Sequence, residues 1–336
     1  MTEVAFLGAY AYYLATGPGF FYCSALPYCS LLRYWTCTVI SRRRLLLGTG
    51  AFIFAMNTDN LYARQDFFPL WPDKPPEGGG PKGALRISAN GSWSNIVTPC
   101  IQRFVPEKPN GKAVLIAAGG GYRWIGMGRE GWPVARWLND KGFTAYVLSY
   151  RLPGENWQDG NHVSLQDAQR AIRLVLSMEQ NVHLLGFSAG GHLLGMAAAR
   201  PDFASYPPQD AIDRLVPKAN SVGLIYPVIT LEPPYTHTNT HLSLVGHHPA
   251  PADEAYWSVQ NYITRTFPPL FIAQAEDDPT SNPQNSVIMH DTCRRHGVPV
   301  QMIRISQGGH GFGLGKVGSP AAIWDEAYAV WLAARH

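Results

Sequence analysis

The sequence contains little charge and few cysteines. Charged residues make up 15% of its 336 positions, against roughly 25% in an ordinary soluble domain. The formal net charge is only +3, and residues 1–63 contribute four arginines against two acidic residues. The remainder therefore has too small a basic excess to make nucleic acid an expected partner. Beyond residue 63 only Cys100 and Cys293 remain of the five cysteines, and one such pair does not establish a disulfide.

Long uninterrupted apolar segments are also missing. No charged residue occurs between Val4 and Leu32, but Gly17-Pro18-Gly19 and Pro27 divide this stretch. Glycine and proline interrupt helices, and a bilayer requires about 20 consecutive apolar residues. The stretch therefore does not predict a single membrane-spanning helix.

A stronger signal follows within residues 1–63. Arg42-Arg43-Arg44 precedes an uncharged run from Leu45 to Ala55, and Leu61-Tyr62-Ala63 provides a small residue suited to cleavage. This order resembles a twin-arginine export signal. We therefore expect an exported protein, periplasmic or secreted, in which residues 1–63 form an N-terminal extension. The alternative is an uncleaved anchor, with membrane contact confined to residues 1–63.

Strand-like and helix-like segments alternate after this extension. Short apolar runs without polar alternation predict strands buried on both faces, at 84–88, 113–118, 144–150, 182–186, 221–229, 270–274 and 300–305. Helical spacing occupies 130–141, 164–178, 190–199, 283–296 and 321–334. This alternation predicts an α/β fold, with a mostly parallel central sheet and helices on both faces. No internal repeat or second boundary appears, so we expect one catalytic domain over 64–336.

The most informative motif is Gly186-Phe187-Ser188-Ala189-Gly190. It directly follows the predicted strand 182–186 and precedes helical spacing, which is the context of a Gly-x-Ser-x-Gly nucleophile elbow. The serine of such an elbow lies on a strained turn, and its neighbours lack side chains so that the backbones can pass. We therefore interpret Ser188 as a nucleophile rather than as part of a plain glycine-rich turn.

A glycine triplet, Gly119-Gly120-Gly121, ends the predicted strand 113–118. A tetrahedral intermediate needs two backbone N–H groups aimed at its oxygen, and consecutive glycines let the main chain approach closely. We assign these donors to Ala189 and to Gly120 or Gly121. A phosphate-binding loop is the alternative, but neither Gly-x-x-x-x-Gly-Lys nor Gly-x-Gly-x-x-Gly with an acidic partner is present.

The candidate general base is His310. It lies among glycines after the last predicted strand, and this position distinguishes it from the other histidines, of which the chain has eleven in total. Asp277 and Asp278 follow the predicted strand 270–274, which gives the chain order serine, acid, histidine. Adjacent residues point in different directions, so we favour Asp278 as the acid and keep Asp277 as the alternative. His192, just after the elbow, is interpreted as packing or supporting the site.

Aromatic residues and a group of histidines provide further candidates. Tyr122, Trp124 and Tyr226 are candidate substrate-binding residues that could stack on sugars or aromatic acyl groups, with core packing as the alternative for each. A proline-rich segment carries His237, His241, His247 and His248. No cysteine or close aspartate pair completes a tetrahedral metal site there. We therefore expect a solvated substrate-lining loop, no metal and no other cofactor.

Several motifs in order resemble one known group of proteins. They are Gly119-Gly120-Gly121-Tyr122 with Arg129-Glu130-Gly131, residues 165–173, the elbow, residues 224–229 and residues 308–313. From about Ala113 to the end, the chain resembles the bacterial acetylxylan esterase and feruloyl esterase group of α/β-hydrolases. Two positions depart from that group: Ala118 replaces a frequent proline, and Asp278-Pro279-Thr280 departs from the usual Asp-x-x-Val-Pro after the acid.

The resemblance implies an α/β-hydrolase fold and a metal-independent carboxylesterase. Members remove acetyl, or in some cases feruloyl, groups from plant polysaccharides or their oligomers. We therefore expect a small-molecule or oligosaccharide ester as substrate. Glycosidase chemistry is not expected, because no carboxylate pair is evident. The alternatives are a short-chain lipase or peptidase with the same triad, and a catalytically silent carbohydrate-binding or cell-envelope protein.

Overall fold

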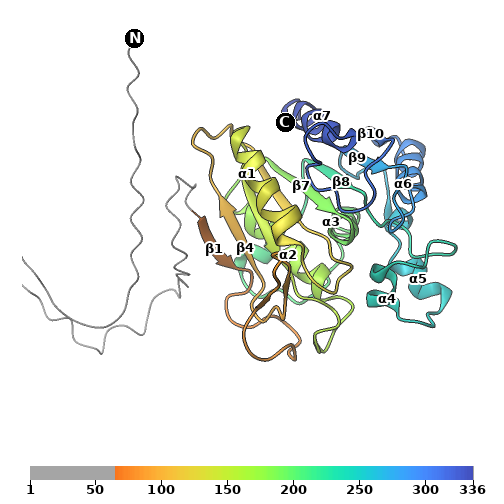
Figure 1. The fold of residues 1–336 in the computed structure, drawn as a ribbon. Coiled ribbons are helices and arrows are strands. Elements are labelled where there is room, and N and C mark those ends of the chain that lie inside the picture. Colours follow the sequence, from red (N-terminus) through yellow and green to blue (C-terminus); the bar gives the residue numbers. More distant parts are fainter. Residues whose placement is uncertain (1–64, 336) are drawn as a thin grey trace, which may run out of the picture. The chain divides into compact units, whose positions relative to one another are not determined.

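Residues 65–335, the part of the chain that the computed structural model describes, contain an eight-stranded sheet (Figure 1). Its order is β1-β4-β6-β5-β7-β8-β9-β10. The strands are β1 (Gln65–Pro69), β4 (Cys100–Phe104), β5 (Ala113–Ala117), β6 (Thr144–Ser149), β7 (Val182–Phe187), β8 (Ser221–Ile225), β9 (Leu270–Ala275) and β10 (Val300–Ile305). Strands β5 to β10 are parallel, whereas β4 pairs antiparallel with both of its neighbours, β6 and β1. The predicted export signal lies outside the described residues.

The parallel strands end together at one edge of the sheet. Ala117 of β5 pairs with Gly186 of β7, and Ala275 of β9 pairs with Ile305 of β10. Strands β5 to β9 are buried along their whole length, as expected when helices cover both faces. The loops after β5, β7, β9 and β10 therefore open at a common edge, where ligands bind in folds of this type.

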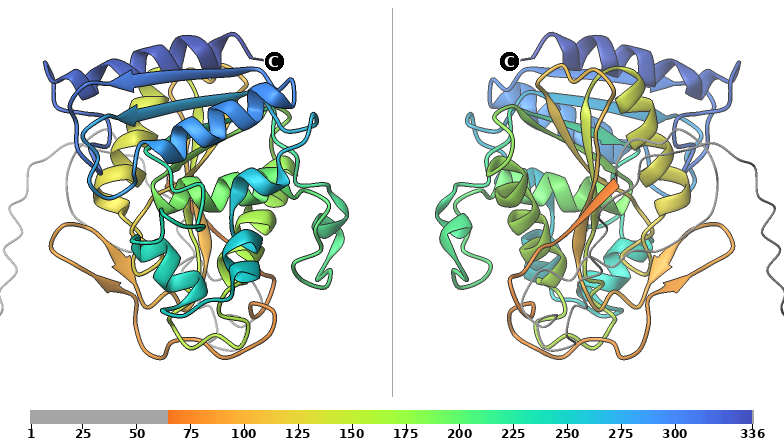
Figure 2. Two further views of the ribbon diagram at one scale, coloured as in Figure 1. Left: turned by 90° about the vertical axis from the view of Figure 1, so that its right-hand side faces the viewer. Right: turned by 90° about the vertical axis from the view of Figure 1, so that its left-hand side faces the viewer.

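Helices cover both faces of the sheet (Figure 2). On one face lie α1 (Trp132–Asp140) and α7 (Trp324–Ala333), whose Trp137 and Tyr328 rings stack with 6.4 Å between centroids. The opposite face carries α2 (Val163–Leu176), α3 (Ala189–Ala199) and α6 (Gln284–Arg295). The predicted fold class, α/β with a mostly parallel sheet between helices, is confirmed.

The first predicted strand does not belong to the central sheet. Its core is β2 (Arg86–Ile87), which pairs with β3 (Trp93–Ser94) in a separate two-stranded sheet. The sheet begins instead with β1 and β4, neither of which the sequence predicted. In β4, the polar residues Gln102 and Arg103 interrupt an otherwise apolar run. A backbone bridge between Trp93 and Ile125 attaches this hairpin to the loop after β5.

The histidine-containing segment between β8 and β9 is solvated in part, as predicted, because His237, His247 and His248 are exposed, but it is not a plain loop. It forms α4 (Asn239–Val245) and α5 (Pro251–Tyr256). His241 is only 6% exposed, and its Nε2 lies 2.8 Å from a carboxylate oxygen of Glu254. Pro251 begins α5 rather than interrupting a helix, because the first helical position needs no N–H donor.

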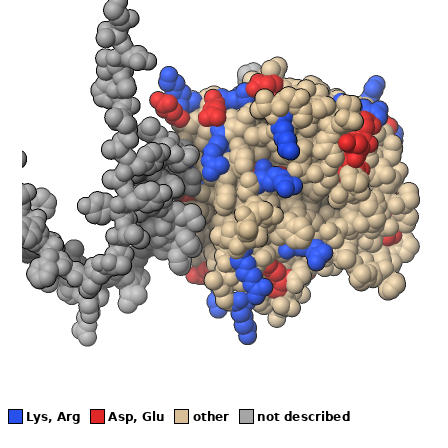
Figure 3. All heavy atoms as spheres, in the orientation of Figure 1, with Lys and Arg blue, Asp and Glu red and all other residues tan. Residues whose placement is uncertain are grey.

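The surface carries few charges. On the face shown in Figure 3, most of the described surface is uncharged, and lysine, arginine, aspartate and glutamate are interspersed. Within residues 65–335, none of the helices has the length and apolar character needed to cross a membrane. These features agree with the low charge content of the sequence.

Candidate active site

Ser188 lies on a sharp turn between β7 and α3. Its φ of 52° is in the left-handed region, which is rare for residues other than glycine. Its N–H donates to the Ile225 carbonyl at 3.0 Å, and its carbonyl accepts the His192 N–H at 3.1 Å. A Cβ at Gly190 would lie 2.1 Å from the Ala117 carbonyl oxygen. The glycine therefore allows this turn to pack against the end of β5.

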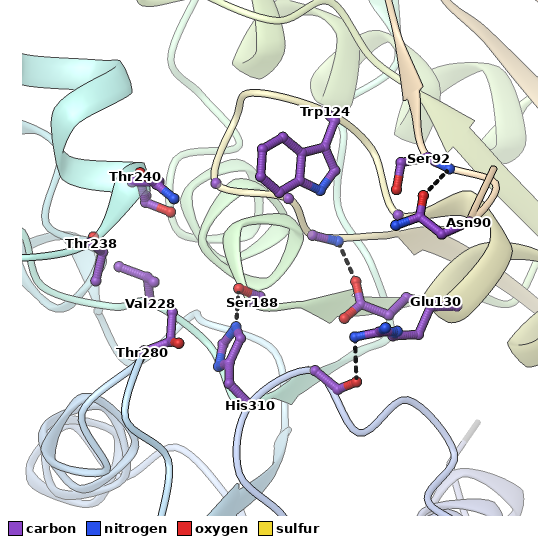
Figure 4. Close-up of a pocket in the computed structure, with 17 residues that line it drawn as sticks. Asn90, Ser92, Trp124, Glu130, Ser188, Val228, Thr238, Thr240, Thr280 and His310 are labelled. Atoms are coloured by element: carbon purple, nitrogen blue, oxygen red, sulfur yellow. Dashed lines mark hydrogen bonds between the residues drawn. The ribbon is translucent and has the colours of Figure 1, made fainter. Parts of the chain in front are cut away.

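Two hydrogen bonds link Ser188, His310 and Asp278 (Figure 4 shows the first). Ser188 Oγ lies 2.8 Å from His310 Nε2, and His310 Nδ1 lies 2.8 Å from Asp278 Oδ2. The other oxygen of Asp278 accepts the N–H groups of Thr280 at 2.8 Å and Ser281 at 2.9 Å. Because Asp278 accepts at Nδ1, the neutral imidazole has a free acceptor at Nε2 facing the serine.

Asp277 occupies a different position from its neighbour. Its Oδ1 accepts the N–H groups of Gly308 and Gly309, each at 2.8 Å. These bonds, led by that from Gly309, hold the pKa of Asp277 below its usual value. Of the two aspartates that the sequence left open, Asp278 contacts the imidazole, whereas Asp277 anchors the loop that carries His310.

The glycine triplet after β5 stands beside Ser188. A Cβ at Gly119 would lie only 2.7 Å from the Ser188 Cβ. Gly120 and Gly121 have φ values of 134° and 62°, which glycine adopts without strain. Within residues 65–335, no acceptor engages the backbone N–H groups of Gly120, Gly121 or Ala189. The predicted oxyanion donors are therefore available at this edge of the sheet.

A buried carboxylate lies behind the triplet. Glu130 is 5% exposed, and its Oε2 accepts the Gly119 N–H at 2.6 Å while its Oε1 accepts the Tyr226 hydroxyl at 2.9 Å. Burial raises the pKa of Glu130, and the bond from Gly119 opposes this most strongly. Sequence reasoning noted Glu130 only as part of a motif. The nearby glycines Gly128 and Gly131 were the available signal of a tightly packed turn.

An open cleft with a volume of about 260 Å³ lies in front of these residues. In Figure 4, Trp124 projects above Ser188, with Asn90 and Ser92 to one side and Thr238 and Thr240 to the other. The Trp124 side chain is 41% exposed. The lining is otherwise mostly glycine and uncharged polar side chains: Asn90, Ser92, Gly119, Gly120, Gly121, Gly126, Arg129, Glu130, Ser188, Val228, Thr238, Asn239, Thr240, Thr280, His310 and Gly311.

The other two candidate substrate-binding aromatics are buried. Tyr122 is 2% and Tyr226 is 0% exposed, so neither offers a ring face to a substrate, and that interpretation is wrong for both. The Tyr122 hydroxyl lies 2.8 Å from Nδ1 of His192. The Tyr226 ring packs edge-to-face on His310, with 5.0 Å between centroids. Each hydroxyl satisfies a buried partner, and their positions support the site from behind.

The histidines of the segment between β8 and β9 have other partners. His237 Nε2 lies 3.1 Å from the Thr280 carbonyl, and His241 pairs with Glu254. The described residues contain no group of three or more histidines, cysteines or carboxylates that could hold a metal ion. The segment contributes to the cleft through Thr238, Asn239 and Thr240, which sequence reasoning did not select.

Comparisons of sequence give a consistent assignment. A protein-family model named BD-FAE matches residues 104–293. An acetylxylan esterase of Xylanibacter ruminicola is 28% identical over 225 residues, which cover 63% of this chain and 43% of that protein. An endo-1,4-β-xylanase B of Butyrivibrio fibrisolvens is 28% identical over 205 residues, which cover 59% of this chain and 32% of that protein. The chain thus spans less than half the length of each.

Comparisons of structure agree. An acetyl ester-xyloside bifunctional hydrolase from Caldicellulosiruptor lactoaceticus is 27% identical with a TM-score of 0.67, over 82% of this chain and 98% of that one. A carboxylesterase from Lactobacillus plantarum is 23% identical with a TM-score of 0.58, over 75% of this chain and 97% of that one. At that identity the second likeness shows the fold alone.

Proposed function

Because this chain belongs to the BD-FAE family and has the α/β-hydrolase fold, we propose that it is a serine carboxylesterase that removes acyl groups, acetyl groups in particular, from carbohydrates. The observation that carries the proposal is the pair of 2.8 Å hydrogen bonds joining Ser188, His310 and Asp278. The relatives named for acetylxylan and acetyl ester-xyloside hydrolysis support the substrate class.

The first half of the reaction acylates the serine. Ser188 Oγ attacks the ester carbonyl carbon while His310 Nε2 takes the hydroxyl proton, and Asp278 stabilises the resulting imidazolium. The carbonyl oxygen becomes an oxyanion, which accepts hydrogen bonds from the Ala189 N–H and from Gly120 or Gly121. The intermediate then collapses, and the sugar leaves as an alcohol with the proton from His310.

The second half releases the acid. A water molecule gives a proton to His310 Nε2 as its oxygen attacks the acyl carbon, and the same N–H donors hold the second oxyanion. Collapse returns the proton to Ser188 Oγ and frees the carboxylic acid. The chain itself supplies the nucleophile, the base, its aspartate partner and the N–H donors for these steps.

The cleft suits a carbohydrate leaving group. The exposed ring of Trp124 provides a flat apolar face, and the amide and hydroxyl side chains on both sides can bond to sugar hydroxyls. Such a combination of an apolar platform with a few polar groups is typical of ligand sites. An apolar cleft would instead favour a short-chain lipase. We therefore place carbohydrate esters ahead of lipids and peptides as substrates.

The decisive experiment compares the wild-type chain with Ser188→Ala. Both proteins are assayed on acetylated xylan, on acetyl, butyryl and feruloyl esters, and on peptide amides. We expect the wild type to prefer acetylated carbohydrate and S188A to lose about 10⁴-fold or more in kcat, as in measured triads. Equal rates in the two proteins would remove the serine mechanism. A wild-type chain that binds xylan without hydrolysing any substrate would identify a silent binding protein.

We also propose that residues 1–63 direct export. The support is the order of Arg42-Arg43-Arg44, an uncharged run and a small-residue end at Ala63. Residues 1–63 can be fused to a reporter that is active only after export in a folded state. The fusion should reach the periplasm or medium, and R42K/R43K should hold it in the cytoplasm. Equal export of both fusions would contradict the proposal.

A further inference from the structure

We propose that Glu130 is a positioning residue that couples the glycine loop of the oxyanion site to the loop that carries His310. The inference rests on the proposed function and adds a second carboxylate, beside Asp278, to its machinery. Glu130 sits on the short turn η1 (Met127–Gly131), between the glycine triplet and α1. From there its two carboxylate oxygens bond to two different loops.

The first contact shapes the glycine loop. Glu130 accepts the Gly119 N–H at 2.6 Å, while the Gly119 carbonyl accepts the Gly126 N–H at 2.9 Å. Both polar groups of the Gly119 backbone are thereby fixed. The next two residues, Gly120 and Gly121, hold the N–H groups proposed to meet the oxyanion. A donor displaced by a fraction of an ångström loses much of its effect, because this stabilisation depends on preorganised geometry.

The second contact reaches the histidine loop. The Tyr226 hydroxyl donates to Glu130 at 2.9 Å and accepts the Gly313 N–H at 3.0 Å. The ring of Tyr226 meanwhile packs on His310 and, at 4.4 Å between centroids, on Phe312. A continuous path of hydrogen bonds and ring contacts therefore joins the oxyanion loop to the base.

A purely structural role accounts poorly for a carboxylate at this place. Glu130 is buried, and its two hydrogen bonds come from one N–H and one O–H, neither of which carries a charge. Burying an ionised group with so little compensation is unfavourable, and a neutral isostere would satisfy much of the same packing. The titratable groups that interact electrostatically with it are Arg129, His310, Tyr150 and Tyr226. A negative charge here favours the imidazolium that forms at His310 in each transition state.

Three variants separate these contributions. Glu130→Gln keeps the size of the side chain, removes its charge and replaces one of the two accepting oxygens by an NH2 donor. We expect kcat to fall about 10- to 100-fold with KM nearly unchanged, because the interaction acts on the transition state. Its activity should also persist to lower pH on the acid side, since the imidazole loses its proton more readily without the nearby charge. Glu130→Asp keeps the charge but shortens the reach, so kcat should fall while the acid side of the pH profile stays in place. Tyr226→Phe breaks the path to Gly313 and should lower kcat by a smaller factor.

The matched control is Glu155→Gln. Glu155 is partly buried rather than buried, but like Glu130 it is a carboxylate that accepts backbone N–H groups, from Asn95 and Ile96, and burial raises its pKa. It does not line the cleft. We expect E155Q to change the unfolding temperature and to leave kcat and the pH profile as in the wild type.

The inference would be overturned if E130Q kept the wild-type kcat and the acid side of its pH profile did not shift. If activity still depended on Ser188, the esterase proposal would stand. If E130Q does not fold, wild-type kcat in Y226F would overturn the inference equally. Wild-type activity in S188A would instead contradict the esterase proposal itself.

Discussion

The burial of His192 makes folding stability depend on pH. The side chain is 0% exposed in the first turn of α3. Its Nε2 lies 2.7 Å from the Trp257 carbonyl, which can only accept, so Nε2 carries the proton and Nδ1 accepts the Tyr122 hydroxyl. A second proton would turn Nδ1 into a donor, so that the Tyr122 hydroxyl could no longer donate to it, and would place a cation near a helix N-terminus. Burial accordingly lowers the pKa of His192 to about 4 from 6.5.

The magnitude follows from the difference between the two states. Between pH 6.5 and pH 4 the unfolded chain binds a proton at this position and the folded chain does not, so stability falls as the pH falls. Above pH 6.5 the neutral imidazole is the main form in both states, and the fold keeps the full stability that this residue allows. At pH 5 the loss from this residue is about 2 kcal/mol, and it approaches about 3 kcal/mol near pH 4.

Urea unfolding, followed by tryptophan fluorescence at pH 7 and pH 5, measures this loss. His192→Gln is the comparison, because its amide can donate to Trp257 and accept from Tyr122 without titrating. His183, whose pKa burial also lowers to about 4, is present in both proteins and cancels. We expect the wild type to lose about 2 kcal/mol more than H192Q between the two pH values. Equal losses would show that His192 is not held neutral by the fold, and the reasoning would be refuted.

Three further predictions concern the site. Asp278→Asn should lower kcat by about 10⁴-fold, as in measured triads, whereas Asp277→Asn should lower it less than tenfold; the reverse order would exchange their roles. Gly119→Ala should lower kcat by about 100-fold, because the added Cβ would lie 2.7 Å from the Ser188 Cβ; a fully active G119A would show that the loop can move aside. Trp124→Ala should raise KM about tenfold for acetylated xylo-oligosaccharides, through the loss of one stacking contact, with little effect on a small acetyl ester; equal effects on both substrates would argue against a sugar platform.

Local chemistry explains why the elbow was predictable. Ser188 needs glycines beside it whatever the rest of the chain does, and a strand followed by a helix can be read from a single window of sequence. The carboxyl edge of a parallel sheet then brings the loops of Gly120 and His310 toward the same place. Most of the candidate site therefore followed from residue order.

Other features escaped the sequence because they depend on partners far away along the chain. β4 pairs antiparallel with β1 on one side and β6 on the other, a position that its polar residues did not reveal. Glu130 is 11 residues from Gly119 and 96 from Tyr226, and nothing local indicates that both contact it. Tyr122 could have stacked on a substrate or on the core, and only packing around His192 decides for the core.

The sequence by itself determined the fold class, the strained turn at Ser188 and the order of the three candidate catalytic residues, since these depend on hydrophobic periodicity and on backbone conformations that glycine permits. Only the tertiary structure decided that Asp278 rather than Asp277 meets His310, and that Trp124 alone of the three candidate aromatics faces the cleft. A linear sequence does not distinguish two adjacent aspartates by the direction of their side chains, nor an exposed aromatic ring from a buried one. Their directions are set by which distant segments occupy the neighbouring space.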